Sequence, residues 1–213
     1  MKTDDLVLML AAGAVAVEPN ALWHRYAAAL GWGSLGAALL MAIWLGVRPD
    51  LAEAAHLPMF WMKLAFPVVL LAGTLMAMAR LSRPGMRLGR VPLAIAAPVL
   101  VMWIVTAIML LGAAPSVRSE LVFGSSWSDC PIYIAALSVP AFVLLLWAMR
   151  GMAPTRPVMA GAASGLLAGV LGALVYALHC TEMAAPFLAI WYVLGMLIPA
   201  AVGAVLGSLV LRW

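Results

Sequence analysis

The sequence is poor in charge. Only 9% of its 213 residues are charged, whereas 67% are hydrophobic, and the mean hydropathy is +1.12. Soluble domains usually contain about 25% charged and about 45–50% apolar residues. A soluble fold of this size could not bury so much apolar surface, because surface shrinks only slowly relative to volume. The composition therefore excludes a soluble globular domain and indicates an integral membrane protein.

Cysteine is also scarce. The chain contains two cysteines, Cys130 and Cys180. Two are too few for a fold built on disulfides, but they are enough for a single bridge or a redox pair. The formal charge of +4 is modest, so its distribution between the two sides of a membrane is more informative than its size.

Long apolar runs dominate the rest of the chain. A helix needs about 20 apolar residues to cross the hydrocarbon core. We expect helices because an open sheet would leave backbone groups unpaired in lipid. The alternation typical of a transmembrane barrel is missing. We therefore predict an all-α polytopic membrane protein, with residues 1–26 as an N-terminal segment and 27–213 as the transmembrane domain. The six predicted spans are 27–47, 64–80, 91–112, 131–149, 159–178 and 187–211.

Basic residues separate the two sides of the predicted bundle. The side that holds both termini and the 81–90 and 150–158 loops carries nine basic residues, and the opposite side carries three. Positive loops face the cytoplasm. We therefore expect both termini to be cytoplasmic. The nine basic residues are Lys2, Arg25, Arg80, Arg83, Arg87, Arg90, Arg150, Arg156 and Arg212, and the three are Arg48, Lys63 and Arg118.

The N-terminus begins with a helix signal. Thr3 fits a helix N-cap, Asp4 and Asp5 lie in the first turn, and Leu6 and Leu10 recur at helical spacing. We predict a short cytoplasmic amphipathic helix over 3–17, followed by a break at 18–20. A cleaved signal peptide is the alternative, but the single lysine before the apolar run is outnumbered by acids.

Two predicted spans contain glycines at four-residue spacing. They are Gly161, Gly165 and Gly169 in the fifth span and Gly203 and Gly207 in the sixth. Small residues at this interval allow close helix packing in membranes. We expect the fifth and sixth spans to pair within one bundle, and a homodimer seam is the alternative.

A transport function finds little support. Transporters place ionisable residues at mid-membrane, and no Asp, Glu, Lys, Arg or His lies near the middle of a predicted span. Prolines inside four spans are more typical of packing kinks than of broken transporter helices. A small transporter or a metal-export accessory protein remains the alternative function.

Most of the reactive side chains are predicted at the outer membrane surface. Cys130 precedes the fourth span and Cys180 follows the fifth, so topology places both at one interface. A static disulfide, a thiol pair responding to oxidants or soft metals, and two buried cysteines without a role all fit. We favour the responsive pair, although the spacing of a strong metal motif is missing. The residues that could assist sensing or complete a metal shell are Asp129, His179, Glu182 and His56.

No catalytic motif is present. The serines near His179 form neither a nucleophile elbow nor a Ser-Lys pair. A quinone-linked disulfide enzyme would need a C-x-x-C pair and a second pair of cysteines, and the chain has neither. We therefore expect a protein that is not an enzyme and that carries no cofactor.

Several separated motifs of the chain are found together in one known family. They occur in the family's order over nearly the whole chain. They are Met1-Lys2-Thr3-Asp4-Asp5-Leu6, Arg48-Pro49-Asp50-Leu51, Phe60-Trp61-Met62-Lys63-Leu64-Ala65, Gly124-Ser125-Ser126-Trp127 with Cys130, Ala153-Pro154-Thr155-Arg156-Pro157, Tyr176-Ala177-Leu178-His179-Cys180-Thr181-Glu182 and Leu211-Arg212-Trp213.

These motifs resemble the NrsF family of negative regulators of sigma-F-type factors. The resemblance implies an anti-sigma factor of the bacterial inner membrane. Such a protein would hold an extracytoplasmic-function sigma factor at the membrane until envelope stress releases it, and would not contact nucleic acid itself. The family's two outer cysteines map onto Cys130 and Cys180, which suggests a place in stress perception. For sigma binding we expect Asp4 and Asp5 to meet a basic surface, while Leu6 and Leu10 enter an apolar groove.

Overall fold

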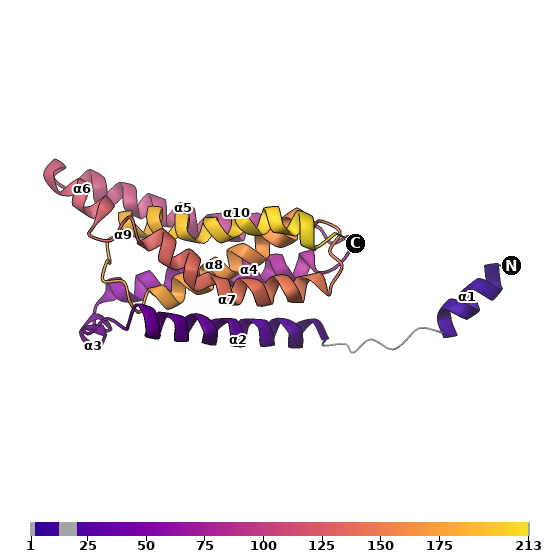
Figure 1. Ribbon diagram of the computed structural model, residues 1–213. Coiled ribbons are helices and arrows are strands. Elements are labelled where there is room, and N and C mark those ends of the chain that lie inside the picture. The colour runs from indigo at the N-terminus through magenta and orange to yellow at the C-terminus, as the bar shows by residue number, and fades with distance from the viewer. Residues whose placement is uncertain (1–2, 13–20, 213) are drawn as a thin grey trace.

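The chain forms a bundle of membrane-length helices (Figure 1). The computed structural model describes residues 3–12 and 21–212, and these residues contain no strand. Six helical segments are long and apolar enough to cross a membrane, which confirms the predicted fold class. They are α2 (Ala21–Trp44), α4 (Pro58–Leu81), α5 (Val91–Gly112), α7 (Cys130–Arg150), α8 (Pro157–Tyr176), and the continuous segment of α9 (Ala185–Phe187), the π-helical η1 (Leu188–Tyr192) and α10 (Val193–Val210).

The bundle has two chemically different ends, which lie at opposite sides of Figure 1. We call residues 45–57, 113–129 and 177–184 the cysteine end. It includes the short helices α3 (Leu51–Ala54) and α6 (Pro115–Phe123). We call residues 82–90, 151–156 and 211–212 the arginine end. The predicted topology requires this division of the loops.

Helix α8 lies at the centre of the bundle and packs against α2, α4, α7 and α10. Its glycines make this possible. A side chain at Gly161 would collide with the backbone of Gly203, and one at Gly165 with the backbone of Pro199. The backbones of α8 and α10 are therefore in contact along a row of small residues, which we call the backbone seam. The predicted pairing of the fifth and sixth spans within one chain is confirmed.

Prolines in the first turn explain where several helices begin. Pro58, Pro92, Pro131, Pro157 and Pro186 each occupy the first or second helical position, where a missing N–H costs nothing. The second span was predicted to begin at residue 64. Helix α4 begins at Pro58 instead.

Helix α5 is peripheral. It contacts α4 along its length and α9 and η1 near the cysteine end. It is the least buried and the most apolar of the six membrane-length segments. Most of its surface is therefore left for lipid or for a partner.

Helix α1 (Thr3–Ala12) stands apart from the bundle (Figure 1). Its described side chains, 3–9 and 11–12, are all exposed. The helix expected near the N-terminus is present over these residues. Positions 13–17 of the expected helix and the break expected at 18–20 lie outside the described residues.

Candidate functional site

The two cysteines lie in one buried cluster at the cysteine end. Cys130 is the first residue of α7, and Cys180 lies in the segment that follows α8. Both are free thiols, and their exposed fractions are 0% and 3%. They share a hydrophobic cluster with Tyr176 and Tyr192. The proximity expected from topology is therefore present, with the thiols covered rather than exposed.

Aromatic rings pack against one another around Tyr176, which belongs to the same cluster as the thiols. The ring centroid of Tyr176 lies 5.7 Å from that of His179, 5.9 Å from that of Tyr192 and 6.1 Å from that of Tyr133. The hydroxyl of Tyr192 is buried and has no hydrogen-bond partner. Buried polar groups are normally paired, so the cluster that holds the thiols also contains an unpaired polar atom.

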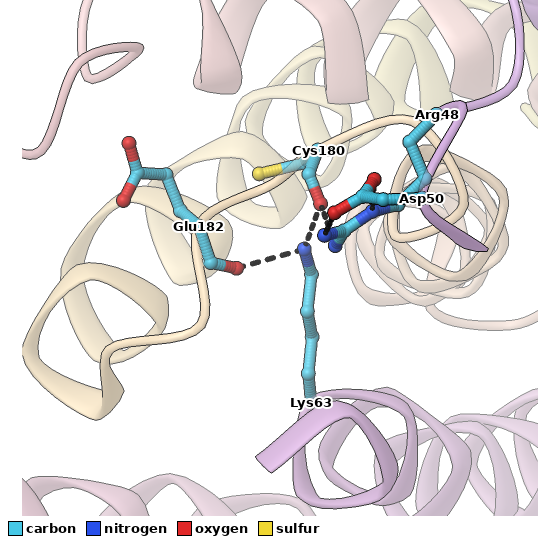
Figure 2. Close-up of polar contacts among 5 residues, drawn as sticks. All are labelled: Arg48, Asp50, Lys63, Cys180 and Glu182. Carbon is cyan, nitrogen blue, oxygen red and sulfur yellow. Dashed lines mark hydrogen bonds and ion pairs between the residues drawn. The ribbon is translucent and has the colours of Figure 1, made fainter. Parts of the chain in front are cut away.

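A buried lysine holds the segment that contains Cys180 (Figure 2). Lys63, in the second turn of α4, is fully buried. Its Nζ donates to the carbonyl oxygen of Cys180 at 2.6 Å and to that of Glu182 at 2.9 Å. The ammonium also lies 5.6 Å from the ring centroid of Tyr192. One side chain of α4 therefore fixes the backbone on both sides of residue 181.

A second cation reaches the same carbonyl. Arg48 follows α2, and its Nη1 donates to the carbonyl oxygen of Cys180 at 3.2 Å. Its Nε and Nη2 donate to the carboxylate of Asp50 at 2.7 and 2.5 Å. The backbone N–H of Arg48 donates to the carbonyl of Leu178 at 3.1 Å. Figure 2 shows the ammonium of Lys63 and the guanidinium of Arg48 converging on one oxygen. We call Arg48, Asp50 and Lys63 with the Cys180 carbonyl the carbonyl clamp.

The ion pair changes the acidity of both partners. Its hydrogen bonds hold the pKa of the Asp50 carboxyl below its usual value and raise the pKa of Arg48. Lys63 has no carboxylate partner within the described residues. Its positive charge therefore remains uncompensated by an acid beside Cys180.

The clamp residues were missed as functional residues by the sequence analysis. Arg48 and Lys63 were taken only as charges that bound the spans. A signal for Lys63 does exist, because it is the single charge within residues 57–79. An isolated lysine in such a run must find partners inside the protein or extend to the membrane surface.

The other four outer-face candidates lie at separate positions, and one of them, His56, is exposed. The Nδ1 of His179 hydrogen-bonds to the carbonyl of Gly46 at 2.9 Å. The carboxylate of Glu182 accepts from the N–H and the hydroxyl of Ser125, each at 2.8 Å. Asp129 is exposed and caps no backbone N–H of α7. Within the described residues no three His, Cys, Asp or Glu side chains gather closely enough to hold a metal.

The predicted sigma-binding residues lie on α1. Asp4, Asp5 and Leu6 are exposed, and the exposed fraction of Leu6 is 41%. The side chain of Leu10 lies outside the described ones. Val7, Leu8 and Met9, which the sequence analysis did not select, are also exposed. The first turn of α1 therefore carries the two acids, and the turn that follows carries exposed apolar side chains.

The comparisons with known proteins agree with the motifs. The family model described as "Negative regulator of sigma F" matches residues 10–213. The chain is 56% identical over 213 residues to the "Probable anti-sigma-F factor NrsF" of Azospira oryzae. It is 42% identical over 215 residues to the "Anti-sigma-F factor NrsF" of Caulobacter vibrioides. Both alignments cover the whole of each chain. No solved structure matches. The chain therefore belongs to the NrsF family of negative regulators of sigma F.

Proposed function

We propose that this protein is a membrane anti-sigma factor that holds an extracytoplasmic-function sigma factor through α1 and releases it when envelope stress alters Cys130 and Cys180. The regulatory, non-enzymatic role follows from the family and from the names of both relatives. The observation that carries the docking proposal is α1, a helix with acidic and apolar side chains that stands apart from the bundle.

The arginine end would face the cytoplasm of a bacterial inner membrane. Residues 82–90, 151–156 and 211–212 contain five arginines (Arg83, Arg87, Arg90, Arg156 and Arg212) and no acid. Cytoplasmic loops carry such an excess of positive charge. A sigma factor works in the cytoplasm, so its binding segment must lie on this side.

The surface of α1 suits a helix-in-groove interaction. The exposed apolar side chains would enter a groove of the sigma factor. Asp4 and Asp5 would meet the basic surface with which that factor contacts DNA, which favours fast and specific association. Occupying this surface would keep the sigma factor away from its promoter.

The sensing step would occur at the thiols. An oxidant would take two electrons from Cys130 and Cys180, with one S–S bond formed and two protons released. A soft metal ion would instead displace the two protons and bind both thiolates. Because both thiols are buried, only small reagents can reach them.

The carbonyl clamp suggests a route from the thiols to α1. Cys180 is tied through its carbonyl to Arg48, the fourth residue after the end of α2. The chain before α2 leads directly to α1. A change at the Cys180 sulfur that displaces its carbonyl would therefore pull on α2 as well.

Removal of the N-terminal segment tests the docking proposal. The full chain should retain the sigma factor in solubilised membranes, and a chain lacking residues 2–17 should leave it free. Replacing Asp4 and Asp5 by lysine should weaken retention without affecting membrane insertion. Replacing Glu53 and Glu120 by lysine makes the same charge change at the cysteine end and should leave retention intact. Continued retention by the shortened chain would move the binding surface to the loops.

Replacement of both cysteines tests sensing. A Cys130→Ser, Cys180→Ser variant should still hold the sigma factor but should no longer release it when cells meet cadmium or diamide. Response to cadmium alone would identify metal binding, and response to diamide alone would identify oxidation. Met196→Leu, which removes another sulfur from the same cluster, is the control. Normal release by the double serine variant would remove the thiols from the mechanism.

A further inference from the structure

An open apolar groove runs along α5. Its volume is about 660 Å³, its floor is formed by α4 and α8, and its second wall is α10. The lining is almost entirely aliphatic or aromatic. Representative residues are Ile95 and Val99 on α5, Ala163 and Leu166 on α8, and Leu197 on α10. A membrane protein cannot leave such a groove empty, because its walls would lose their packing contacts.

The groove has the length of one leaflet. Its lining on α5 extends from Val91 to Trp103. Twelve residues of α-helix rise about 18 Å. Half of the hydrocarbon core is about 15 Å thick. A single acyl chain that enters from one membrane surface would therefore run along most of the groove.

The two ends of the groove differ. Near the cysteine end, Trp103 bridges α5 to the π-helical segment, since its Nε1 donates to the carbonyl of Ala189 at 3.2 Å. At the other end the lining includes Leu88 and Val91, which belong to or adjoin the arginine end. The groove is thus closed toward the cysteine end and begins at the arginine end.

The open end carries positive charge. Arg87 and Arg90 flank the lining residue Leu88 in the chain and are both exposed. Arg90 also occupies the N-cap of the 22-residue helix α5, where the positive end of the helix dipole attracts anions. The Nη1 of Arg80 donates to the carbonyl of Leu88 at 2.7 Å, which fixes the loop beside them. Residues 80–92 contain no acid.

We propose that this groove is a binding site for an anionic phospholipid, with one acyl chain between α5 and α10 and the phosphate at Arg87 and Arg90. A leaflet-length apolar groove that opens at arginines without acidic neighbours matches both parts of such a lipid. A second copy of this chain could fill the apolar part, but it would bring its own positively charged arginine end to the same place. This site is independent of sigma binding and of the thiols.

Lipid exchange on the purified full chain tests the proposal. The protein in a neutral detergent is mixed with phosphatidylglycerol or with phosphatidylcholine of identical acyl chains, and bound lipid is counted by native mass spectrometry. We expect one phosphatidylglycerol to be retained selectively. Because each arginine near the membrane surface contributes about 1 kcal/mol, or about fivefold, the double variant Arg87→Gln, Arg90→Gln should weaken its retention about 10- to 30-fold. The control variant Arg25→Gln, Arg150→Gln makes the same charge change at another pocket and should leave lipid retention unchanged.

A second variant separates the groove from the surface. Ala96→Trp places a large ring in the groove from an exposed position of α5 and should abolish retention, whereas Ile108→Trp, outside the lining, should not. Equal retention of the two lipids would overturn the proposal. Retention that depends on the arginines but not on position 96 would reduce it to surface attraction. A dimer that Ala96→Trp dissociates, without change in lipid retention, would assign the groove to a second copy.

Discussion

The two ends of this bundle use positive charge in opposite ways. At the cysteine end, Arg48 and Lys63 are buried and their donors are directed at backbone carbonyls and at Asp50. At the arginine end, Arg83, Arg87 and Arg90 are exposed. The Arg48–Asp50 ion pair is the only one among the described residues. Buried cations without partners would be costly, so the first set determines a backbone conformation. The exposed arginines remain free to contact lipid headgroups and to determine the orientation of the protein in the membrane.

The largest effect should come from Lys63. Lys63→Met leaves the Glu182 carbonyl without its donor and the Cys180 carbonyl with Arg48 alone. The loss of two charge-assisted hydrogen bonds should lower the free energy of unfolding by about 2–4 kcal/mol. Equilibrium unfolding in mixed micelles measures this. The Cys180 thiol should also react faster with iodoacetamide in a Cys130→Ser background. A variant as stable and as unreactive as the parent would mean that Lys63 does not fix this segment.

A smaller effect is expected at Arg48. Arg48→Gln removes one hydrogen bond to the Cys180 carbonyl and the ion pair with Asp50. We expect a loss of about 1–2 kcal/mol, because Lys63 still holds the carbonyl. Arg118→Gln is the matched control at the same end, since Arg118 is exposed and donates only to the Ala113 carbonyl. Similar losses for both variants would remove the distinction between buried and exposed arginines.

The ion pair also predicts a pH dependence. The folded-state pKa of Asp50 lies below the unfolded value of about 4. The stability from the pair is therefore present above about pH 4 and is lost as the pH falls through the lower folded-state pKa. The midpoint of thermal unfolding should drop over this range in the parent, and the drop should be smaller in Asp50→Asn. Asp129→Asn, which removes an exposed carboxyl at the same end, should follow the parent.

The smallest effect is expected at the arginine end. Arg83→Gln should change the free energy of unfolding by no more than about 0.5 kcal/mol, because Arg83 is exposed and forms no ion pair. The same unfolding measurement in micelles tests it. A loss as large as that of Lys63→Met would show that the arginine end stabilises the fold, contrary to the comparison above.

Much of the fold could be predicted because lipid imposes strong rules on composition. The apolar runs located all six membrane-length segments, and the glycine spacing identified the α8–α10 contact. Helix α4 begins earlier than the predicted second span, because Lys63 was read as the edge of that span. In fact the helix begins at Pro58, and the lysine is satisfied inside the protein. Charge alone does not reveal whether a lysine faces water or protein carbonyls.

The candidate site was only partly predictable. Topology was enough to place Cys130 and Cys180 together. The carbonyl clamp was not predictable, because Lys63 and Arg48 recognise backbone oxygens, and any residue at position 180 would provide one. The apolar groove depends on how far α5 stands from α10, and no residue pattern encodes that separation.

The backbone seam between α8 and α10 limits how this protein can move. Where Gly161 meets Gly203 and Gly165 meets Pro199, the main chains are in contact, with no side chain between them that could change rotamer. If α8 and α10 slid or twisted against each other, their peptide groups would collide. The two helices should therefore move as one rigid unit. Any switching motion is then left to the outer helices, α2 and α5, which have a free face. Spin labels on α8 and α10 should therefore keep one narrow distance distribution in every signalling state.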